Sequence, residues 1–196
     1  MFNYQKAFYL TSSKNYKFLP KDLGIEIAFL GRSNAGKSTI INTLTQKKNL
    51  AKSSKTPGCT NLINLFQLDK IRRIVDFPGY GFTKSSTKKL GKYFEIYLEK
   101  RKSLKGVIIV IDVRHIQMPM DIHMVKWTVS SDLPCHIILN KSDKLNIYTR
   151  NKMLKLANSF YNKENNKIIT MQLFSNKIKT IGLKKLKNIL NKWYHI

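Results

Sequence analysis

Short apolar runs alternate with segments of helical spacing along most of this chain. The runs are rich in Ile, Val, Leu and Phe, as expected of strands buried on both faces of a parallel sheet. They lie at 25–30, 61–68, 71–76, 107–112, 136–140 and 168–174, with a candidate edge strand at 7–11. Helical spacing predicts helices at 39–44, 90–102, 120–129, 148–161 and 183–193. Polar segments at 46–60 and 77–89 are predicted as loops. This alternation predicts an α/β fold with a mostly parallel, doubly wound sheet.

One connection departs from the parallel pattern. The strands at 61–68 and 71–76 are separated by the dipeptide Asp69-Lys70. Because a parallel connection needs a crossover of a dozen residues or so, this pair must be antiparallel. The chain shows no internal repeat and no long linker. It therefore predicts a single domain over 1–196, with 1–23 as a short extension before the first core strand.

A phosphate-binding loop follows the strand at 25–30. The sequence matches the pattern G-x-x-x-x-G-K-[ST] at Gly31, Arg32, Ser33, Asn34, Ala35, Gly36, Lys37 and Ser38. A glycine-containing surface turn is the alternative, but a strand before the motif and a helix after it favour phosphate binding, because backbone N–H groups and the helix dipole then converge. Lys37 is expected to reach the β- and γ-phosphates, and the Ser38 hydroxyl to bind Mg²⁺.

A second phosphate-sensing motif ends the strand at 71–76. It spells D-x-x-G at Asp76, Phe77, Pro78 and Gly79. In phosphate-loop nucleotidases the carboxylate at such a strand end holds Mg²⁺, usually through water, and the glycine N–H meets the γ-phosphate. The tetrapeptide alone is more often a turn, but its place after an apolar strand favours the functional interpretation.

The base-reading motif N-K-x-D ends the strand at 136–140. It comprises Asn140, Lys141, Ser142 and Asp143. The Asp143 carboxylate can accept two N–H bonds from guanine, whereas adenine offers no such pair of donors and would leave a buried carboxylate unpaired. The motif therefore predicts GTP and GDP and argues against an ATP-dependent kinase. A weaker element that meets the guanine oxygen follows the last strand, at Phe174, Ser175 and Asn176.

The lysine-rich loop at 46–60 contains the candidate switch residue. A GTPase places a threonine between its phosphate loop and D-x-x-G, on Mg²⁺ and the γ-phosphate. Thr60 and Thr56 both lie in this interval. From position alone, Thr60 is the candidate and Thr56 competes with it.

Taken in order, these motifs resemble the EngB/YihA (YsxC) family of bacterial ribosome-biogenesis GTPases, within the translation-factor class. The resemblance covers nearly the whole chain and rests on 31–38, 54–64, 76–82, 97–101 and 112–115. The family pattern Thr-Pro-Gly-x-Thr assigns the switch role to Thr60. It also implies nucleotide contacts from Gly58, Cys59, Thr60, Asn61 and Leu62, catalytic roles for Lys37, Thr60 and Gly79, and Mg²⁺ binding by Ser38, Thr60 and Asp76. Cys59 stands where the family usually has arginine, and Asn140 where many members have threonine.

That resemblance implies GTP and Mg²⁺ binding, maturation of the large ribosomal subunit, and a need for the protein in normal division and septation. Tyr80 follows Gly79 where Ras-like GTPases have a water-orienting glutamine, so hydrolysis is expected to be slow without a partner. Asn34 occupies a position where an asparagine in some related GTPases holds K⁺, which predicts stimulation by K⁺. A loop-shaping role is the alternative for Asn34.

Charge adds a prediction about partners. The chain has 36 Lys and Arg against 11 Asp and Glu, a net charge of +25, which favours polyanions such as RNA. A compositional bias toward lysine is the alternative. The partner implied is ribosomal RNA in a precursor of the large subunit. The alternative hypothesis is a GTP-dependent interaction switch in cell division, with incidental RNA binding.

The remaining composition narrows the class of protein. Two cysteines without C-x-x-C spacing predict neither a disulfide framework nor a zinc site. No apolar run is long enough to cross a bilayer and no signal-peptide core is visible, so we expect a cytoplasmic monomer without membrane insertion.

Overall fold

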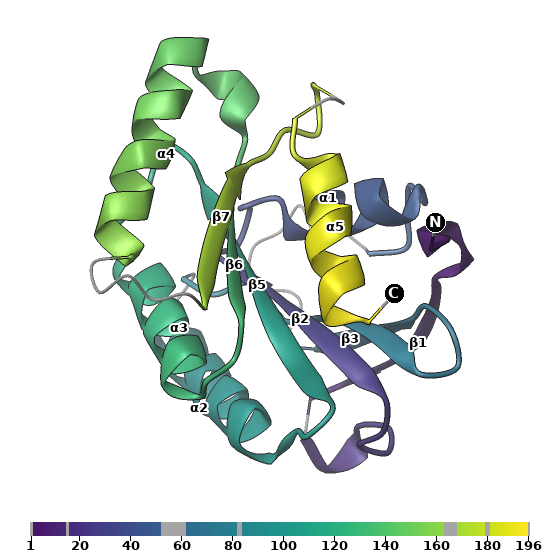
Figure 1. Ribbon diagram of the computed structural model, residues 1–196. Coiled ribbons are helices and arrows are strands. Elements are labelled where there is room, and N and C mark those ends of the chain that lie inside the picture. The colour runs from purple at the N-terminus through teal and green to yellow at the C-terminus, as the bar shows by residue number, and fades with distance from the viewer. Residues whose placement is uncertain are drawn as a thin grey trace.

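The computed structural model describes residues 2–14, 16–51, 62–81, 84–162, 168–178 and 181–195, with the backbone alone for 84–90. Within these residues the chain forms a seven-stranded sheet in the order β1-β3-β4-β2-β5-β6-β7 (Figure 1). The strands are β1 (Phe8–Ser13), β2 (Ile25–Gly31), β3 (Ile63–Gln67), β4 (Arg72–Asp76), β5 (Leu104–Asp112), β6 (Cys135–Asn140) and β7 (Ile169–Leu173). The helices are α1 (Lys37–Thr45), α2 (Lys84–Lys100), α3 (Pro119–Ser130), α4 (Ile147–Tyr161) and α5 (Leu183–Trp193), with short 3-10 turns η1 (Tyr4–Lys6), η2 (Tyr16–Phe18) and η3 (Ser142–Lys144).

Strand direction agrees with the sequence. β4, β2, β5, β6 and β7 are mutually parallel, whereas β3 runs antiparallel to both of its neighbours, β1 and β4. In the turn between β3 and β4, the Asp69 carboxylate accepts hydrogen bonds from the N–H groups of Ile71 (3.0 Å) and Arg72 (2.9 Å). The predicted mostly parallel sheet with one antiparallel strand is confirmed among the described strands.

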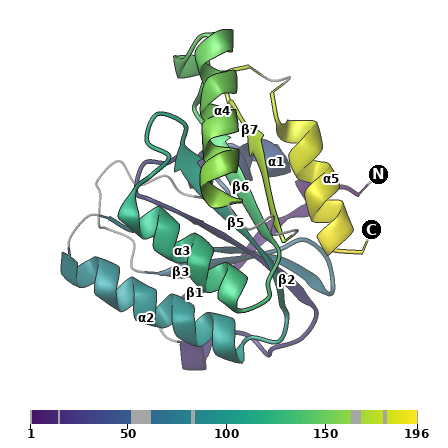
Figure 2. The same cartoon turned by 60° about the vertical axis from the view of Figure 1, so that its left-hand side comes forward.

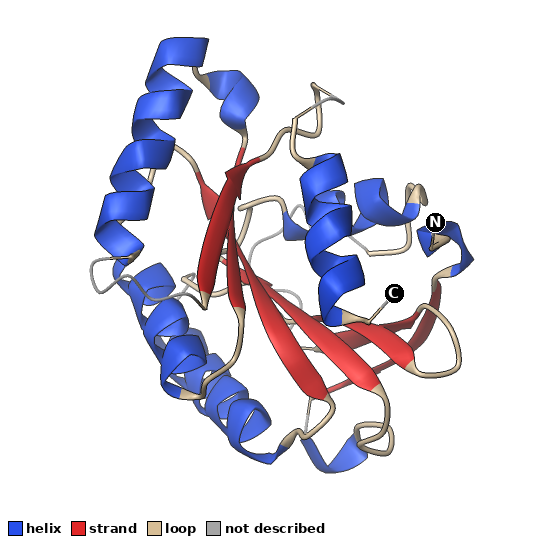
Figure 3. Cartoon of the chain, viewed as in Figure 1, coloured by secondary structure: helices blue, strands red, loops and turns tan. Residues whose placement is uncertain are grey.

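Helices cover both faces of the sheet (Figures 2 and 3). Apolar side chains of α2, α3 and α4 pack on one face, among them Phe94, Tyr97, Met124, Val125 and Ala157. Those of α1 and α5 pack on the other, among them Ile40, Ile41, Leu44, Leu186 and Leu190. Because both faces are covered, the central strands are apolar over most of their length. Their carboxyl ends carry the loops of the predicted site.

Two predicted boundaries were wrong. Helix α2 begins at Lys84, so residues 84–89 are helical rather than part of a loop. Their sequence, Lys-Ser-Ser-Thr-Lys-Lys, contains no apolar residue and therefore gives no helical periodicity. The candidate edge strand at 7–11 lies at Phe8–Ser13, and pairs with β3 with a shift of register between Tyr9 and Thr11. The other predicted elements are present with ends displaced by a few residues.

A buried charge network fixes the end of α2 that lies farther from the phosphate loop. Glu26, at the start of β2, is fully buried. Its carboxylate accepts hydrogen bonds from Arg101 Nε (2.8 Å) and Nη2 (2.7 Å), from Tyr97 Oη (2.5 Å) and from Arg73 Nη1 (3.0 Å). Burial alone would raise the pKa of Glu26, but these donors hold it below its usual value. The network ties the end of α2 to the amino end of β2.

Candidate nucleotide-binding site

The phosphate loop, residues 31–38, joins the carboxyl end of β2 to the first turn of α1. Gly36 precedes the helix with φ +98°, and a Cβ added there would lie 2.2 Å from Asn140 Nδ2. Glycine is therefore required both by the left-handed backbone and by the close approach. Asn34 is also left-handed, with φ +65°, a conformation that asparagine tolerates better than most residues. The first N–H groups of α1 have no helical partner and are available to an anion.

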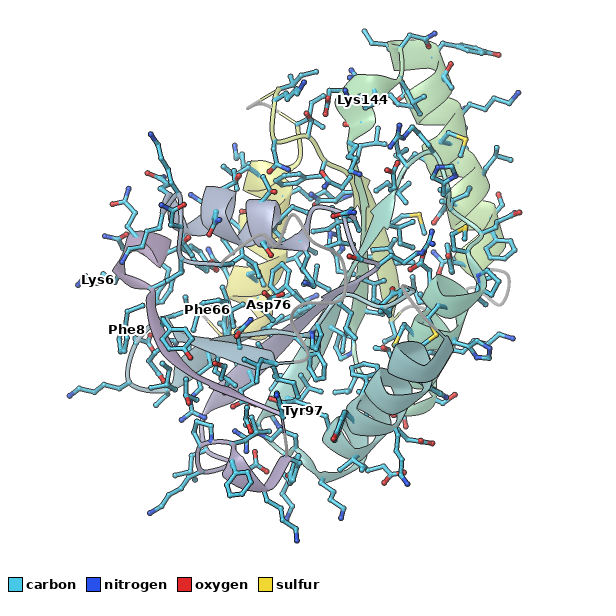
Figure 4. The ribbon with its side chains drawn as sticks, turned by 180° about the vertical axis from the view of Figure 1, so that it is seen from behind. Lys6, Phe8, Phe66, Asp76, Tyr97 and Lys144 are labelled. Carbon is cyan, nitrogen blue, oxygen red and sulfur yellow. The ribbon has the colours of Figure 1, made fainter. Side chains whose placement is uncertain are left out.

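Lys37 and Asp76 are brought together at the carboxyl ends of β2 and β4. Their Nζ and Oδ1 atoms are 2.8 Å apart, and the side chains are only 10% and 5% exposed. The same Asp76 oxygen receives no hydrogen bond of good geometry, so the lysine charge is its partner among the described residues. Figure 4 shows Asp76 near the centre of the molecule. A buried carboxylate with so few donors is suited to a further positive charge.

The base-reading loop, residues 140–143, is attached to the phosphate loop. Asn140 Nδ2 donates to the Ala35 carbonyl oxygen at 2.8 Å. Ser142 donates to the carbonyl oxygen of Phe174 through both its Oγ (2.9 Å) and its N–H (3.1 Å). Three motifs that are distant in sequence therefore meet at one edge of the sheet, as the sequence predicts.

Ser175 positions the carboxylate of Asp143. Its Oγ donates to Asp143 Oδ1 at 2.8 Å and accepts from the N–H groups of Lys177 and Ile178, both at 3.1 Å. The sequence predicts Ser175 only as part of a loop whose backbone meets the base. The hydroxyl contact with Asp143 was missed, because no local pattern specifies which strand end lies opposite.

Lys141 contacts Asp112, which the N-K-x-D motif does not predict. It has φ +61°, and its Nζ lies 3.1 Å from Asp112 Oδ2. Asp112 also accepts from Arg114 Nε (2.9 Å) and Nη2 (2.7 Å). Although partial burial opposes ionisation of Asp112, the donors Arg114 and Lys141 hold its pKa well below the usual range. The ion pair with Asp112 holds Lys141 beside the phosphate loop.

The Tyr80 side chain does not take the role of the water-orienting glutamine that Ras-like GTPases have at this position. Its side chain is buried, and its Oη donates to Asp121 Oδ1 in α3 at 2.6 Å. Phe77 is likewise a core residue, with its ring centroid 5.3 Å from that of Phe94 and 5.1 Å from that of Tyr97. The backbone of the D-x-x-G segment and the Asp76 carboxylate are therefore available to a ligand, while Phe77 and the following Tyr80 anchor the segment in the core.

A cavity of about 180 Å³ lies between the phosphate loop, the end of β5 and the start of α3. Its lining includes Arg32, Asn34, Asp112, Arg114, Asp121 and Lys141. The cavity therefore lies beside both the phosphate loop and Lys141 of the base-reading loop.

Part of the predicted site lies outside the described residues, namely Gly58, Cys59, Thr60 and Asn61, together with the competing Thr56. Leu62 is described and is half-buried just before β3. Among the described side chains, no group of three or more His, Cys, Asp and Glu residues is arranged to hold a metal. No described helix is long and apolar enough to cross a membrane.

Comparisons with known proteins agree with this geometry. The profile of a family described as 50S ribosome-binding GTPase matches residues 26–141. A probable GTP-binding protein EngB from Coxiella burnetii is 45% identical over 97% of this chain and 94% of its own length. The corresponding protein of Histophilus somni is 44% identical, covering 98% and 95%.

Solved structures show the same fold. The crystal structure of a probable GTP-binding protein EngB superimposes with a TM-score of 0.67 at 25% identity, covering 87% of this chain and 98% of that one. Era, solved with MgGDPNP and a segment of 16S ribosomal RNA, has a TM-score of 0.61 at 21% identity, covering 87% of this chain and 57% of that one. At that identity the likeness to Era concerns the fold alone.

Proposed function

This chain belongs to the EngB family of GTPases, and on that premise we propose that it is a nucleotide-timed assembly factor for the large ribosomal subunit, needed for normal division and septation. It acts in the cytoplasm as a monomer of one GTPase domain, and GTP hydrolysis times its release from the precursor particle. The observation that carries the ribosomal part is the net charge of +25 in a family described as 50S ribosome-binding. Such a charge attracts polyanions such as RNA.

For the nucleotide, the phosphate loop and Lys37 hold the β- and γ-phosphates, and Asp143 reads guanine. Two contacts support this assignment. Asn140 fixes the base-reading loop against the phosphate loop, and Ser175 orients the Asp143 carboxylate. Thr60 closes on the γ-phosphate. The remaining nucleotide contacts come from Gly58, Cys59, Asn61, Leu62, Lys141, Ser142, Phe174 and Asn176.

For magnesium, the residues fit the ion. Ser38, Thr60 and Asp76 are hard oxygen donors, and the buried Asp76 oxygen has the Lys37 charge as its described partner. Bound magnesium would neutralise charge on the phosphates. Lys37, which contacts Asp76 here, would then contact the nucleotide phosphates instead.

Hydrolysis is slow in the isolated protein. Tyr80 has no amide to orient water, and its hydroxyl is occupied by Asp121. Lys37 and the N–H groups of the phosphate loop and of Gly79 supply most of the electrostatic stabilisation. We propose K⁺, held by the Asn34 amide, as a stimulating ion. The alternative, a role for Asn34 in shaping the loop, would account for its left-handed backbone.

Sedimentation with purified ribosomal subunits tests this proposal. The protein is loaded with GDP or a non-hydrolysable GTP analogue and spun at several salt concentrations, with Lys37→Ala as a control that keeps nearly the same charge but loses the nucleotide. Stronger binding to the large subunit with the analogue, surviving moderate salt, is expected. Binding that ignores the nucleotide and disappears in modest salt would support the alternative hypothesis, an interaction switch in cell division with incidental RNA binding.

A further inference from the structure

Asp121 is a buried carboxylate to which the proposed function gives no role. It lies in the first turn of α3 and is 1% exposed. Burial raises the pKa of Asp121 from 3.8 to about 6, because the Tyr80 hydrogen bond and the Arg32 charge offset only part of the desolvation. An apolar residue would fill such a position at a lower energetic cost. The acid therefore calls for an explanation other than packing.

Its partner is tied to the phosphate loop at the other end. The carbonyl oxygen of Tyr80 accepts from the N–H of Ser33 at 2.9 Å, and the N–H of Tyr80 donates to the carbonyl oxygen of Gly31 at 3.4 Å. The preceding residue, Gly79, lies so close that an added Cβ would be 2.8 Å from Ser33 Cα. Tyr80 is thus held by its backbone on the phosphate loop and by its hydroxyl on α3.

We propose that Asp121 is a positioning residue for GTP hydrolysis, which holds the Tyr80 hydroxyl and thereby fixes the backbone at Gly79. This inference rests on the proposed nucleotide site, in which the Gly79 N–H meets the γ-phosphate. In Ras-like enzymes the residue after this glycine orients water with its side chain; here the same position fixes the glycine instead. Because GDP has no γ-phosphate, its affinity does not depend on this anchor.

Four variants test the assignment by single-turnover hydrolysis and by affinities for GDP and a non-hydrolysable GTP analogue. Asp121→Ala and Tyr80→Phe each remove the anchor and are expected to lower the hydrolysis rate about tenfold or more, since small misplacements at a reacting centre have effects of this size. Their GDP affinity stays unchanged. Asp121→Asn retains an oxygen that accepts from Tyr80 and should restore hydrolysis to near the wild-type rate.

Tyr194→Phe is the matched control. Tyr194 is buried and donates from its hydroxyl to the Arg73 carbonyl oxygen at 2.7 Å, near the amino end of β4, so this variant loses one comparable hydrogen bond away from residues 79–80. Equal losses of rate in Tyr80→Phe and Tyr194→Phe, or a parallel loss of GDP affinity, would overturn the inference. If Asp121→Ala does not fold, Tyr80→Phe decides alone. A wild-type protein that neither binds nor hydrolyses GTP overturns the proposed site as well, which separates the two failures.

Discussion

Two buried carboxylates at opposite ends of the central strands are paired in contrasting ways. Glu26, where β2 begins, accepts from four donor atoms, two of them on Arg101. Asp76, where β4 ends, has the Lys37 ammonium as its described partner. A carboxylate has about four acceptor positions, so the first is saturated and the second is not. The saturated group fixes the fold, whereas the unsaturated group keeps capacity for a ligand.

The largest effect is expected from a substitution of Glu26, the carboxylate whose acceptor positions are all occupied. Glu26→Gln places an amide N–H₂ against donors from Arg101 and Tyr97, which leaves buried charges unpaired. It should lower the free energy of unfolding by about 3–5 kcal/mol, measured by urea denaturation. Glu95→Gln, an exposed change on α2, serves as the control and should have almost no effect. A loss below about 1 kcal/mol for Glu26→Gln would mean that the network is not a structural anchor.

Asp143 is a second unsaturated carboxylate, with the Ser175 hydroxyl as its side-chain donor among the described residues. Asp143→Asn should lower GTP affinity about 10³-fold, because the guanine N–H donors lose their acceptor. Affinity for xanthosine triphosphate should rise. Ser175→Ala keeps the acceptor and loses only its orientation, so it should cost about tenfold or less. Titration with both nucleotides measures this, and unchanged GTP affinity in Asp143→Asn would remove the guanine-reading role.

Asp121 is a third unsaturated carboxylate, since the Tyr80 hydroxyl is its hydrogen-bond donor among the described residues. Its folded pKa of about 6 lies above the unfolded value, so the folded protein binds more protons between about pH 4 and pH 6. Stability from this group is therefore present at acidic pH and is lost as pH rises through 6, by up to about 3 kcal/mol.

Urea unfolding of the wild type and of Asp121→Asn at pH 4.5, 5.5 and 7 measures this contribution. Other carboxylates titrate in both proteins and cancel in the difference. Asp121→Asn should gain stability relative to the wild type as pH rises. Parallel curves would show that Asp121 has an ordinary pKa in the folded state.

The sequence predicted the features that contiguous residues specify, and it did not predict contacts between residues that are distant along the chain. The phosphate loop, D-x-x-G and N-K-x-D are contiguous motifs, so their residues and strand positions could be predicted locally, and the apolar runs predicted the sheet. The partners of Glu26 could not be predicted, because Tyr97 and Arg101 lie far away along the chain and meet it only after α2 packs. The same holds for Tyr80 with Asp121 and for Asp143 with Ser175. Helix α2 began earlier than predicted because residues 84–89 are polar.

At Asp76, the carboxylate with unoccupied acceptor positions, Asp76→Asn should weaken magnesium-dependent GTP binding rather than lower the stability of the fold. An asparagine keeps the shape but loses the charge, and such changes around a metal lower metal affinity about 10–100-fold. Magnesium titrations of the GTP complex measure the loss, and GTP binding in EDTA serves as the baseline. A drop in affinity that is equally large without magnesium would assign Asp76 to the orientation of Lys37 instead.

The smallest effect is expected at Asn34, which lies in the phosphate loop and is exposed. Because its φ is +65°, Asn34→Gly preserves the loop and removes only the amide, whereas alanine would add backbone strain. If the amide holds K⁺, wild-type turnover is faster in K⁺ than in Na⁺, and Asn34→Gly gives equal rates. Asn34→Asp keeps an oxygen and tolerates the left-handed backbone, so it should retain the preference for K⁺. Equal wild-type rates in the two salts would leave Asn34 with the loop-shaping role that its backbone already explains.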